Sequence, residues 1–188
     1  ELARDIANKF NYDYQATFFP EINPIIFGSA TRVMSLRDGN KKMSKSDDSD
    51  YSRINLLDDE DSIKNKIKKA KTDSESIMGY EALDDNGEFK NSVISERPEA
   101  VNLINIFSAI NNEPKKRVVE TFMGKNFSSL KESLTECLIN RIVPIGKEMK
   151  RIKEDNSFLS SLLEKGSEEA TENAKKNILE IKKIIGLY

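Results

Sequence analysis

The segment from residue 32 to residue 47 holds the side chains best suited to chemistry. Lys41, Lys42 and Lys45 alternate there with the hydroxyls of Ser44 and Ser46. Lysine ammonium groups act as point charges on phosphate oxygens, and serine hydroxyls and backbone N–H groups can complete a cradle for an anion. These residue types and their spacing predict a phosphate-binding loop. The alternative is a solvated surface loop rich in lysine and serine.

An apolar run and a turn precede this loop and would position it. Residues 33 to 36 read as a short strand, and Asp38-Gly39-Asn40 marks a turn. The apolar end of such a strand offers a surface on which a flat base can pack. An ordinary core role for Val33 is the alternative interpretation.

The whole segment resembles one family. Lys42-Met43-Ser44-Lys45-Ser46 is similar to the nucleotide-binding signature of class I aminoacyl-tRNA synthetases, and its flanks resemble bacterial tryptophanyl-tRNA synthetases. Further stretches resemble that family in the same order: residues 1–7 with Phe10-Asn11, residues 63–74, 97–103, 124–127, Leu130-Lys131, Pro144-Ile145 and 185–187. The resemblance covers nearly the whole chain. Residues 81–94 match least well and read as an insertion.

The resemblance implies roles for the loop residues. Lys42 and Lys45 would be catalytic, because they would stabilise charge on the α-phosphate of ATP and on the leaving pyrophosphate. The implied nucleotide-binding residues are Val33, Lys42, Met43, Ser44, Lys45 and Ser46. Magnesium would arrive with ATP, and no protein metal site is expected. The chain has no histidine and a single cysteine, Cys137, which makes a zinc site very improbable.

The resemblance also implies an activity and partners. The activity would be ATP-dependent ligation of L-tryptophan to tRNA(Trp) through an aminoacyl-adenylate, in a cytoplasmic homodimer. The chain begins at Glu1 and lacks the family's upstream ATP signature and amino-acid pocket. We therefore expect the C-terminal part of a longer enzyme that is inactive alone. The alternatives are a tyrosine–tRNA ligase and a non-catalytic RNA-binding helical module.

Composition limits the other classes of function. Charged residues make up 33% and hydrophobic residues 37%, with a net charge of −2, which favours a helix-rich protein over a generally basic nucleic-acid coat. Contacts to RNA would come from local basic faces at residues 115–117 and 147–153, with Phe122, Phe127, Arg117 or Arg141 as candidates for stacking on bases. No apolar run approaches the roughly 20 residues of a membrane helix.

The predicted fold is mostly α. Residues 1–50 would end a Rossmann-like α/β catalytic domain, and residues 51–188 would form a helical domain of the anticodon-binding type. Apolar spacing, prolines and glycines predict helices at 2–11, 63–71, from Pro98, from Pro114 to Gly124, at 127–153 with a kink at Pro144, up to Gly166, and at 168–185. A buried strand is predicted at 25–27, ended by Gly28, and a long loop at 72–96.

Overall fold

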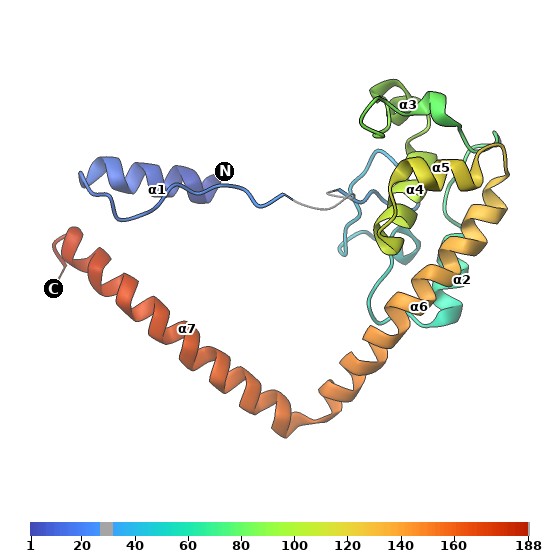
Figure 1. Cartoon of the computed structure of the whole chain (residues 1–188). Helices are drawn as coiled ribbons and strands as arrows, with labels where there is room; N and C mark the ends of the chain where they lie inside the picture. Colours follow the sequence, from blue (N-terminus) through green and yellow to red (C-terminus); the bar gives the residue numbers. More distant parts are fainter. Residues whose placement is uncertain (27–31, 188) are drawn as a thin grey trace. The chain divides into compact units, whose positions relative to one another are not determined.

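A computed structural model describes residues 1–26 and 32–187 (Figure 1). These residues contain seven α-helices, two short 3-10 helices and two isolated β-bridges, so the prediction of a mostly α fold is confirmed. The chain divides into two compact units, one made of residues 1–26 and 152–188 and the other of residues 27–151. The predicted boundary between functional domains at residues 50 and 51 stays a prediction.

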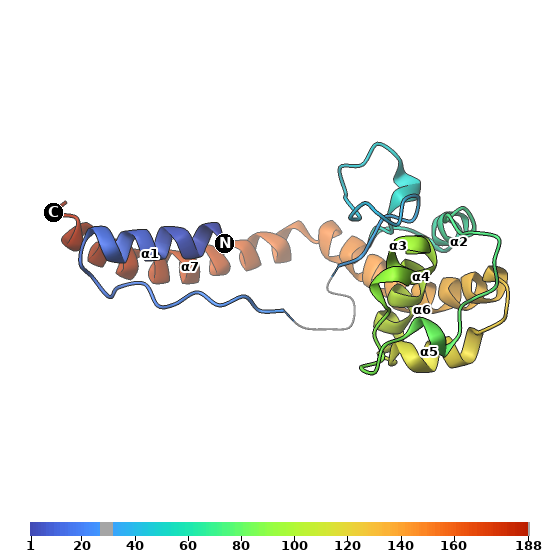
Figure 2. The same ribbon diagram turned by 90° about the horizontal axis from the view of Figure 1, so that it is seen from above.

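The first unit combines α1 (Leu2–Asp13) with α7 (Asn156–Ile184), and the C-terminal part of α7 lies beside α1 in both ribbon views (Figure 2). The segment after α1 folds back onto it. The side chain of Asn11 donates to the carbonyl of Phe19 at 2.7 Å and accepts the Phe19 N–H at 3.1 Å. The rings of Phe10 and Phe19 meet edge to face with centroids 5.1 Å apart, which fixes the returning segment by aromatic packing.

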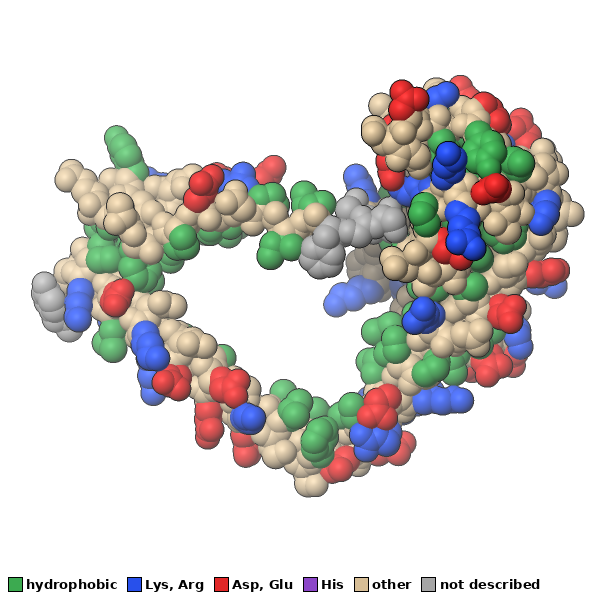
Figure 3. Space-filling model, in the orientation of Figure 1, with side chains coloured by type: hydrophobic (Ala, Val, Ile, Leu, Met, Phe, Trp, Pro, Cys, Tyr) green, Lys and Arg blue, Asp and Glu red, His purple; other side chains and the backbone are tan. Residues whose placement is uncertain are grey.

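Helix α7 is longer than its sequence suggests. It runs unbroken through Gly166, so the predicted end at that residue is wrong. A glycine weakens a helix interior by only about 1 kcal/mol relative to alanine, which the rest of a long helix can offset. Apolar side chains remain exposed along α7 (Figure 3), among them Phe158, Leu162, Leu163, Ile178 and Leu179. No helix in the described ranges is long and apolar enough to cross a bilayer.

The second unit is built around α4 (Pro98–Asn111), which buries residues on most of its circumference. Around it lie α2 (Glu60–Lys68), α5 (Lys115–Phe122) and α6 (Phe127–Glu154). The fully buried core side chains include Ile63, Ile67, Leu103, Ile104, Val118, Val119, Leu130 and Leu134. Burial of these residues from four helices supplies the main hydrophobic stabilisation of the unit.

Local signals set the ends of these helices. Pro98 occupies the first turn of α4, where its missing N–H is harmless. The carboxylate of Asp59 accepts the Ser62 N–H at 2.8 Å and caps α2. Helix α6 continues past Pro144 to Glu154, which confirms that this proline does not end it.

Residues 72–96 are more ordered than the predicted long loop. They contain a 3-10 helix, η2 (Tyr80–Ala82), and helix α3 (Asn91–Glu96). A β-bridge between Leu83 and Phe89 closes a turn within this segment, and both side chains are buried. The prediction failed because the few apolar residues here are scattered among polar ones and find their partners in other helices.

The strand predictions are less accurate than the helix predictions. Residues 33–36 form one isolated bridge, Met34 with Lys42, and no regular strand. Ile25 and Ile26 are irregular and 85% and 73% exposed, so the predicted buried strand is wrong there, while Phe27 and Gly28 lie outside the described residues. Short strands need the partners of a larger sheet, and no sheet occurs in the described parts of this chain.

Candidate functional site

The predicted phosphate-binding residues lie on and just after a small antiparallel hairpin, residues 33–43, which we call the lysine hairpin. Its centre is the bridge between Met34 and Lys42. Three backbone hydrogen bonds close it: Ser35 N–H to Lys41 O at 2.7 Å, Met43 N–H to Val33 O at 3.0 Å, and Lys41 N–H to Asp38 O at 3.1 Å. The predicted turn at residues 38–40 therefore folds the lysines back along the preceding apolar residues.

The hairpin separates apolar from charged side chains. Val33 and Met43 are half-buried and pack against the hydrophobic core, which supports the alternative, structural role for the Val33 side chain. Lys42 and Lys45 are exposed, and neither forms an ion pair with any residue in the described ranges. Lys41, by contrast, lies 3.6 Å from Asp38. The two cations assigned to catalysis are thus the ones free to meet an anion.

The two loop serines bind each other. The hydroxyls of Ser44 and Ser46 lie 3.0 Å apart, and Ser44 Oγ also accepts the Ser46 N–H at 3.3 Å. Both side chains are exposed. This local hydrogen bonding shapes the loop between the two lysines and keeps two hydroxyls beside them.

Helix α4 holds the hairpin from one side. The buried carboxamide of Asn102 contacts the backbone of Met34, with Oδ1 accepting its N–H at 2.9 Å and Nδ2 donating to its carbonyl at 2.8 Å. At the turn, a Cβ on Gly39 would lie 2.5 Å from the carbonyl carbon of Pro98, so only glycine permits this approach. Residues 97–103, recognised in the sequence only as a family resemblance, therefore form the support of the hairpin.

Glu99 strengthens the same contact. Its carboxylate accepts from Lys71 Nζ at 2.7 Å and from the Gly39 N–H at 3.4 Å. Burial acts to raise the pKa of Glu99, but the hydrogen bonds from Lys71 and the backbone outweigh it and hold the pKa below its usual range. Glu99 is therefore ionised at neutral pH and ties the turn to both α4 and the segment after α2.

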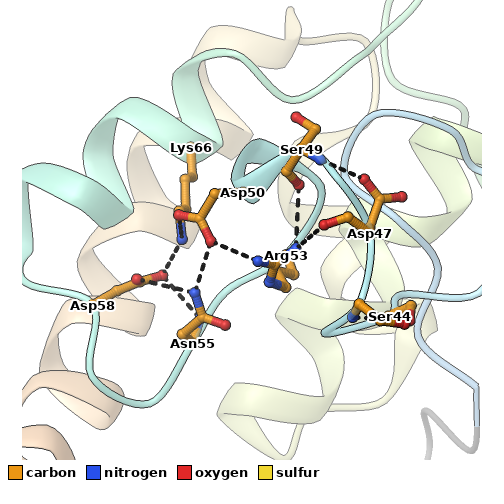
Figure 4. Close-up of polar contacts among 9 residues, drawn as sticks. Ser44, Asp47, Ser49, Asp50, Arg53, Asn55, Asp58 and Lys66 are labelled. Carbon is orange, nitrogen blue, oxygen red and sulfur yellow. Dashed lines mark hydrogen bonds and ion pairs between the residues drawn. The ribbon is translucent and has the colours of Figure 1, made fainter.

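A polar network fixes the chain where it leaves the loop (Figure 4). The guanidinium of Arg53 donates to the carbonyl of Asp47 at 2.8 Å and to that of Ser49 at 3.4 Å. It also pairs with the carboxylate of Asp50 at 3.1 Å. Arg53 thus gathers three residues of the loop exit around one planar group.

The network ends in a buried lysine. Lys66 of α2 is only 4% exposed in its side chain, and its Nζ lies 2.6 Å from Asp58 and 2.7 Å from Asp50 (Figure 4). The hydrogen bond from Lys66, followed by that from Asn55, lowers the pKa of Asp50. Lys66 therefore differs from Lys64 and Lys68, the exposed lysines of the same helix, because two carboxylates surround its ammonium group.

A groove of about 760 Å³ lies between α2 and α6. Lys131 lines it and donates to the carbonyl of Ala70 at 2.7 Å, at the C-terminal end of α2. Burial, and secondly the nearby Arg37, lower the pKa of Lys131. The described residues contain no group of three or more acidic, cysteine or histidine side chains able to hold a metal ion.

The residues considered for RNA contacts divide by burial. Phe122 and Phe127 are 4% and 7% exposed, so they are core residues and not stacking platforms. Lys115 is buried and pairs with Glu88, which removes it from the predicted basic face. The remaining candidates are exposed: Lys116, Arg117, Arg141, Lys147, Lys150, Arg151 and Lys153. Of these, Arg151 pairs with Glu148 at 2.7 Å.

Comparison with known proteins identifies relatives over the whole chain. Residues 1–142 match the family described as tRNA synthetases class I (W and Y). A tryptophan–tRNA ligase from Caulobacter vibrioides is 43% identical over 189 residues, covering 100% of this chain and 52% of the relative. One from Brucella melitensis is 42% identical, covering 99% of this chain and 55% of the relative. The chain spans about half the length of the curated relatives it matches.

Solved structures agree with this assignment. The tryptophanyl-tRNA synthetase of Mycoplasma pneumoniae superposes with a TM-score of 0.78 at 25% identity, covering 100% of this chain and 54% of that structure. The Campylobacter jejuni tryptophanyl-tRNA synthetase, solved in complex with ADP and tryptophan, superposes with a TM-score of 0.60 at 22% identity. It covers 99% of this chain and 53% of that structure, and it shows likeness of fold alone.

Proposed function

This chain belongs to the class I tRNA synthetases (W and Y), and from that premise we propose that it forms about half of a tryptophan–tRNA ligase. The enzyme would activate L-tryptophan with ATP and transfer it to tRNA(Trp). The curated relatives at 42–43% identity carry the name of tryptophan–tRNA ligase, which favours tryptophan over tyrosine as the substrate. The structural observation that carries the proposal is the pair of exposed lysines on and just after the lysine hairpin, Lys42 and Lys45, which form no ion pair with the described residues.

The chemistry of activation fits these side chains. A carboxylate oxygen of tryptophan attacks the α-phosphorus of ATP, the bond to the bridging oxygen breaks, and pyrophosphate leaves with the electron pair. Negative charge accumulates on the α-phosphate oxygens and on the leaving group, so preorganised cations accelerate the step. Lys45 would contact the pyrophosphate and Lys42 the neighbouring phosphate oxygens. Magnesium bound to ATP would add charge without a protein site of its own.

The other predicted residues would assist from the same loop. Ser44 and Ser46 would exchange their mutual hydrogen bond for donation to phosphate oxygens. Met43 anchors the loop to the hydrophobic core, and the backbone beside Val33 would lie against the adenine. Residues 1–50 would belong to the catalytic domain and residues 51–188 to the tRNA-binding domain of a cytoplasmic homodimer.

The role of Lys45 can be tested by replacement with alanine in an enzyme of the relatives' full length. Loss of one preorganised transition-state donor corresponds to roughly 3–4 kcal/mol, or about 10²–10³ in kcat. The assay is single-turnover formation of tryptophanyl-adenylate. Lys41→Ala is the matched control, because Lys41 is on the same hairpin and already pairs with Asp38. An unchanged kcat in Lys45→Ala would assign the loop a purely structural role.

The 188-residue chain itself supplies a second test. It carries the lysine hairpin and spans about half of the relatives' length, so we expect no tryptophan-dependent pyrophosphate exchange by this chain alone. Robust exchange would contradict the assignment of the amino-acid pocket to the other half.

Binding of tRNA can be separated from activation. Lys150 is exposed on α6, far in the sequence from the lysine hairpin. Charge reversal, Lys150→Glu, should weaken tRNA(Trp) binding and reduce its salt dependence by about one counterion per lost phosphate contact. Adenylate formation should stay near normal. An unchanged salt slope after reversal of both Lys147 and Lys150 would leave this part of α6 as scaffold.

A further inference from the structure

The hydrogen-bond pattern of the lysine hairpin leaves one residue with its backbone groups turned outward. The two bonds that flank the bridge join Ser35 to Lys41 and Met43 to Val33. In an antiparallel pair this pattern makes Met34 and Lys42 a non-hydrogen-bonded pair, so the N–H and C=O of Met34 point away from the lysine side. Such groups must find other partners when they are shielded from water.

Asn102 supplies both partners. Its Oδ1 accepts the Met34 N–H at 2.9 Å and its Nδ2 donates to the Met34 carbonyl at 2.8 Å, with a longer contact of 3.4 Å to the carbonyl of Ser35. A carboxamide has the same donor and acceptor as a peptide group. Asn102, which is 3% exposed, therefore takes the place that a neighbouring strand would occupy at this edge.

The geometry fixes Lys42 through a short chain of contacts. Asn102 lies within α4, the central helix of the second unit, and Met34 lies between Asn102 and Lys42. The opposite end of the hairpin approaches the same helix, where Gly39 meets Pro98. The hairpin is thus attached to α4 at Met34 and at its turn, and the segment after the turn carries Lys41 and Lys42.

We propose that Asn102 is a positioning residue. By taking the place of a neighbouring strand at Met34, Asn102 holds the lysine hairpin in position, and Lys42 with it. One consequence of this proposal rests on the proposed function: a displaced hairpin should bind phosphate less well. The attachment itself is a property of the chain and can be measured without catalysis.

Asn102→Asp is the most informative variant, because it removes only the donor group of Asn102. An ionised carboxylate can still accept the Met34 N–H, but it has no donor for the Met34 carbonyl and faces that oxygen with negative charge. Protonation of the introduced carboxyl restores one donor in nearly the same shape. Asn102→Ala removes both groups and cannot recover. Asn105→Asp is the matched control for a buried carboxylate in α4. Asn105 lies one turn along the helix and its buried Oδ1 has no hydrogen-bond partner among the described residues, so this variant shows the general cost of the charge without the loss of a bond to Met34.

The first experiment is residue-resolved amide hydrogen exchange on the 188-residue chain at neutral pH. In Asn102→Asp, the Met34 carbonyl loses its donor and faces a negative charge, which should detach this part of the hairpin from α4. Exchange at the Met34 amide should then accelerate at least about tenfold, the change expected when a buried polar group loses its partner. Ser35 and Met43, whose amides do not touch Asn102, should accelerate severalfold. The core amides of Ile63 and Leu134 should stay within about twofold, which separates displacement of the hairpin from general loss of stability.

Acidification and ligand binding complete the test. As the pH is lowered, protection in Asn102→Asp should return toward that of the wild type at the same pH, while Asn102→Ala should not recover. If Asn102→Asp does not fold at neutral pH, return of the folded spectrum on acidification decides the question equally. In an NMR titration at neutral pH with inorganic pyrophosphate as the probe, its apparent Kd should weaken severalfold in Asn102→Asp and stay unchanged in Asn105→Asp.

The outcomes separate the two proposals. Unchanged protection at Ser35 and Met43, or equal acceleration throughout α2 and α6, would overturn the positioning role. A loss of pyrophosphate affinity as large in the Asn105→Asp control would overturn it as well. If the wild-type chain fails to bind pyrophosphate, the proposed function loses its support, and the exchange pattern alone decides the role of Asn102.

Discussion

Replacing Lys66 with methionine tests the buried end of the polar network. Methionine keeps most of the length of the side chain and removes the ammonium group. In the wild type that group is 2.6 Å from Asp58 and 2.7 Å from Asp50, and the lysine side chain is 4% exposed. The variant therefore leaves two carboxylates without their shared cation while the surrounding packing changes little.

The expected loss follows from the exposure of the two carboxylates. Removing one partner of a fully buried ion pair destabilises by about 3–5 kcal/mol. Asp50 is 56% exposed and can be rehydrated, so its share is small. Asp58 is 11% exposed, and within the described part of the chain its carboxylate retains only the bonds from Asn55, whose N–H lies 2.8 Å away. We expect a loss of about 2–3 kcal/mol, equivalent to a fall in Tm of about 4–12 °C for a chain of this size.

The assay must report on the second unit alone, because two compact units need not unfold together. Urea unfolding followed through the NMR amide signals of Ile63 and Leu134 meets that need, since both residues are fully buried there. Lys64→Met is the matched control on the same helix. Its ammonium is solvent-exposed and lies 3.7 Å from Asp61, so its loss should change stability by less than about 0.5 kcal/mol.

Acid titration gives the result that would refute this reasoning. The pKa of Asp50 is lowered chiefly by Lys66, so the stabilisation is present above the ordinary aspartate pKa of about 3.9 and is lost as the pH falls through the lowered value. The share of the difference that Asp50 contributes should therefore be lost in acid, and the gap in stability between the wild type and Lys66→Met should narrow. A loss no larger than that of Lys64→Met, or a difference that grows in acid, would show that the ammonium does not stabilise the network.

Three further substitutions test other contacts. Gly39→Ala should destabilise the second unit by about 1–3 kcal/mol and shift the amide signals of the lysine hairpin, because the new Cβ would meet Pro98 backbone at 2.5 Å; an unperturbed spectrum would contradict this. Gly166→Ala meets open space within α7 and should stabilise that helix by up to about 1 kcal/mol, measured by thermal unfolding, whereas destabilisation would argue against a continuous helix. Burial acts to raise the pKa of Asp73, but hydrogen bonds from Arg97 and the backbone lower it overall. The stability that ionised Asp73 contributes is therefore present above the ordinary aspartate pKa of about 3.9 and is lost as the pH falls through the lowered value. Urea unfolding should find Asp73→Asn less stable than the wild type at pH 7 and similar to it in acid; parallel pH profiles would refute the pairing.

Local patterns were enough to predict most helices. Helix α1, the start of α4 at Pro98, and the passage of α6 through Pro144 depend on apolar spacing and on the fixed φ of proline, which neighbouring residues determine. The candidate phosphate-binding residues were also recognisable, because the lysines and hydroxyls of the loop are contiguous in the sequence.

Tertiary structure decided the remainder of the fold. Gly166 was predicted to end a helix and does not, since its weak local preference is overridden by the residues on both sides. Leu83 and Phe89 looked like parts of a loop and are core residues. Besides their bridge to each other, both belong to one hydrophobic core with side chains of α2, α4, α5 and α6, and no local window of sequence contains that core.

The same reason applies to the supports of the candidate site. Asn102 is 68 residues from Met34, and Glu99 is 60 residues from Gly39. Lys66 had the same sequence signal as the exposed lysines around it on α2, and only folding brings Asp50 and Asp58 to its ammonium. The sequence by itself therefore indicated the candidate phosphate-binding residues. The tertiary structure decided which residues hold them, because burial and hydrogen bonding across distant segments exist only in the folded chain.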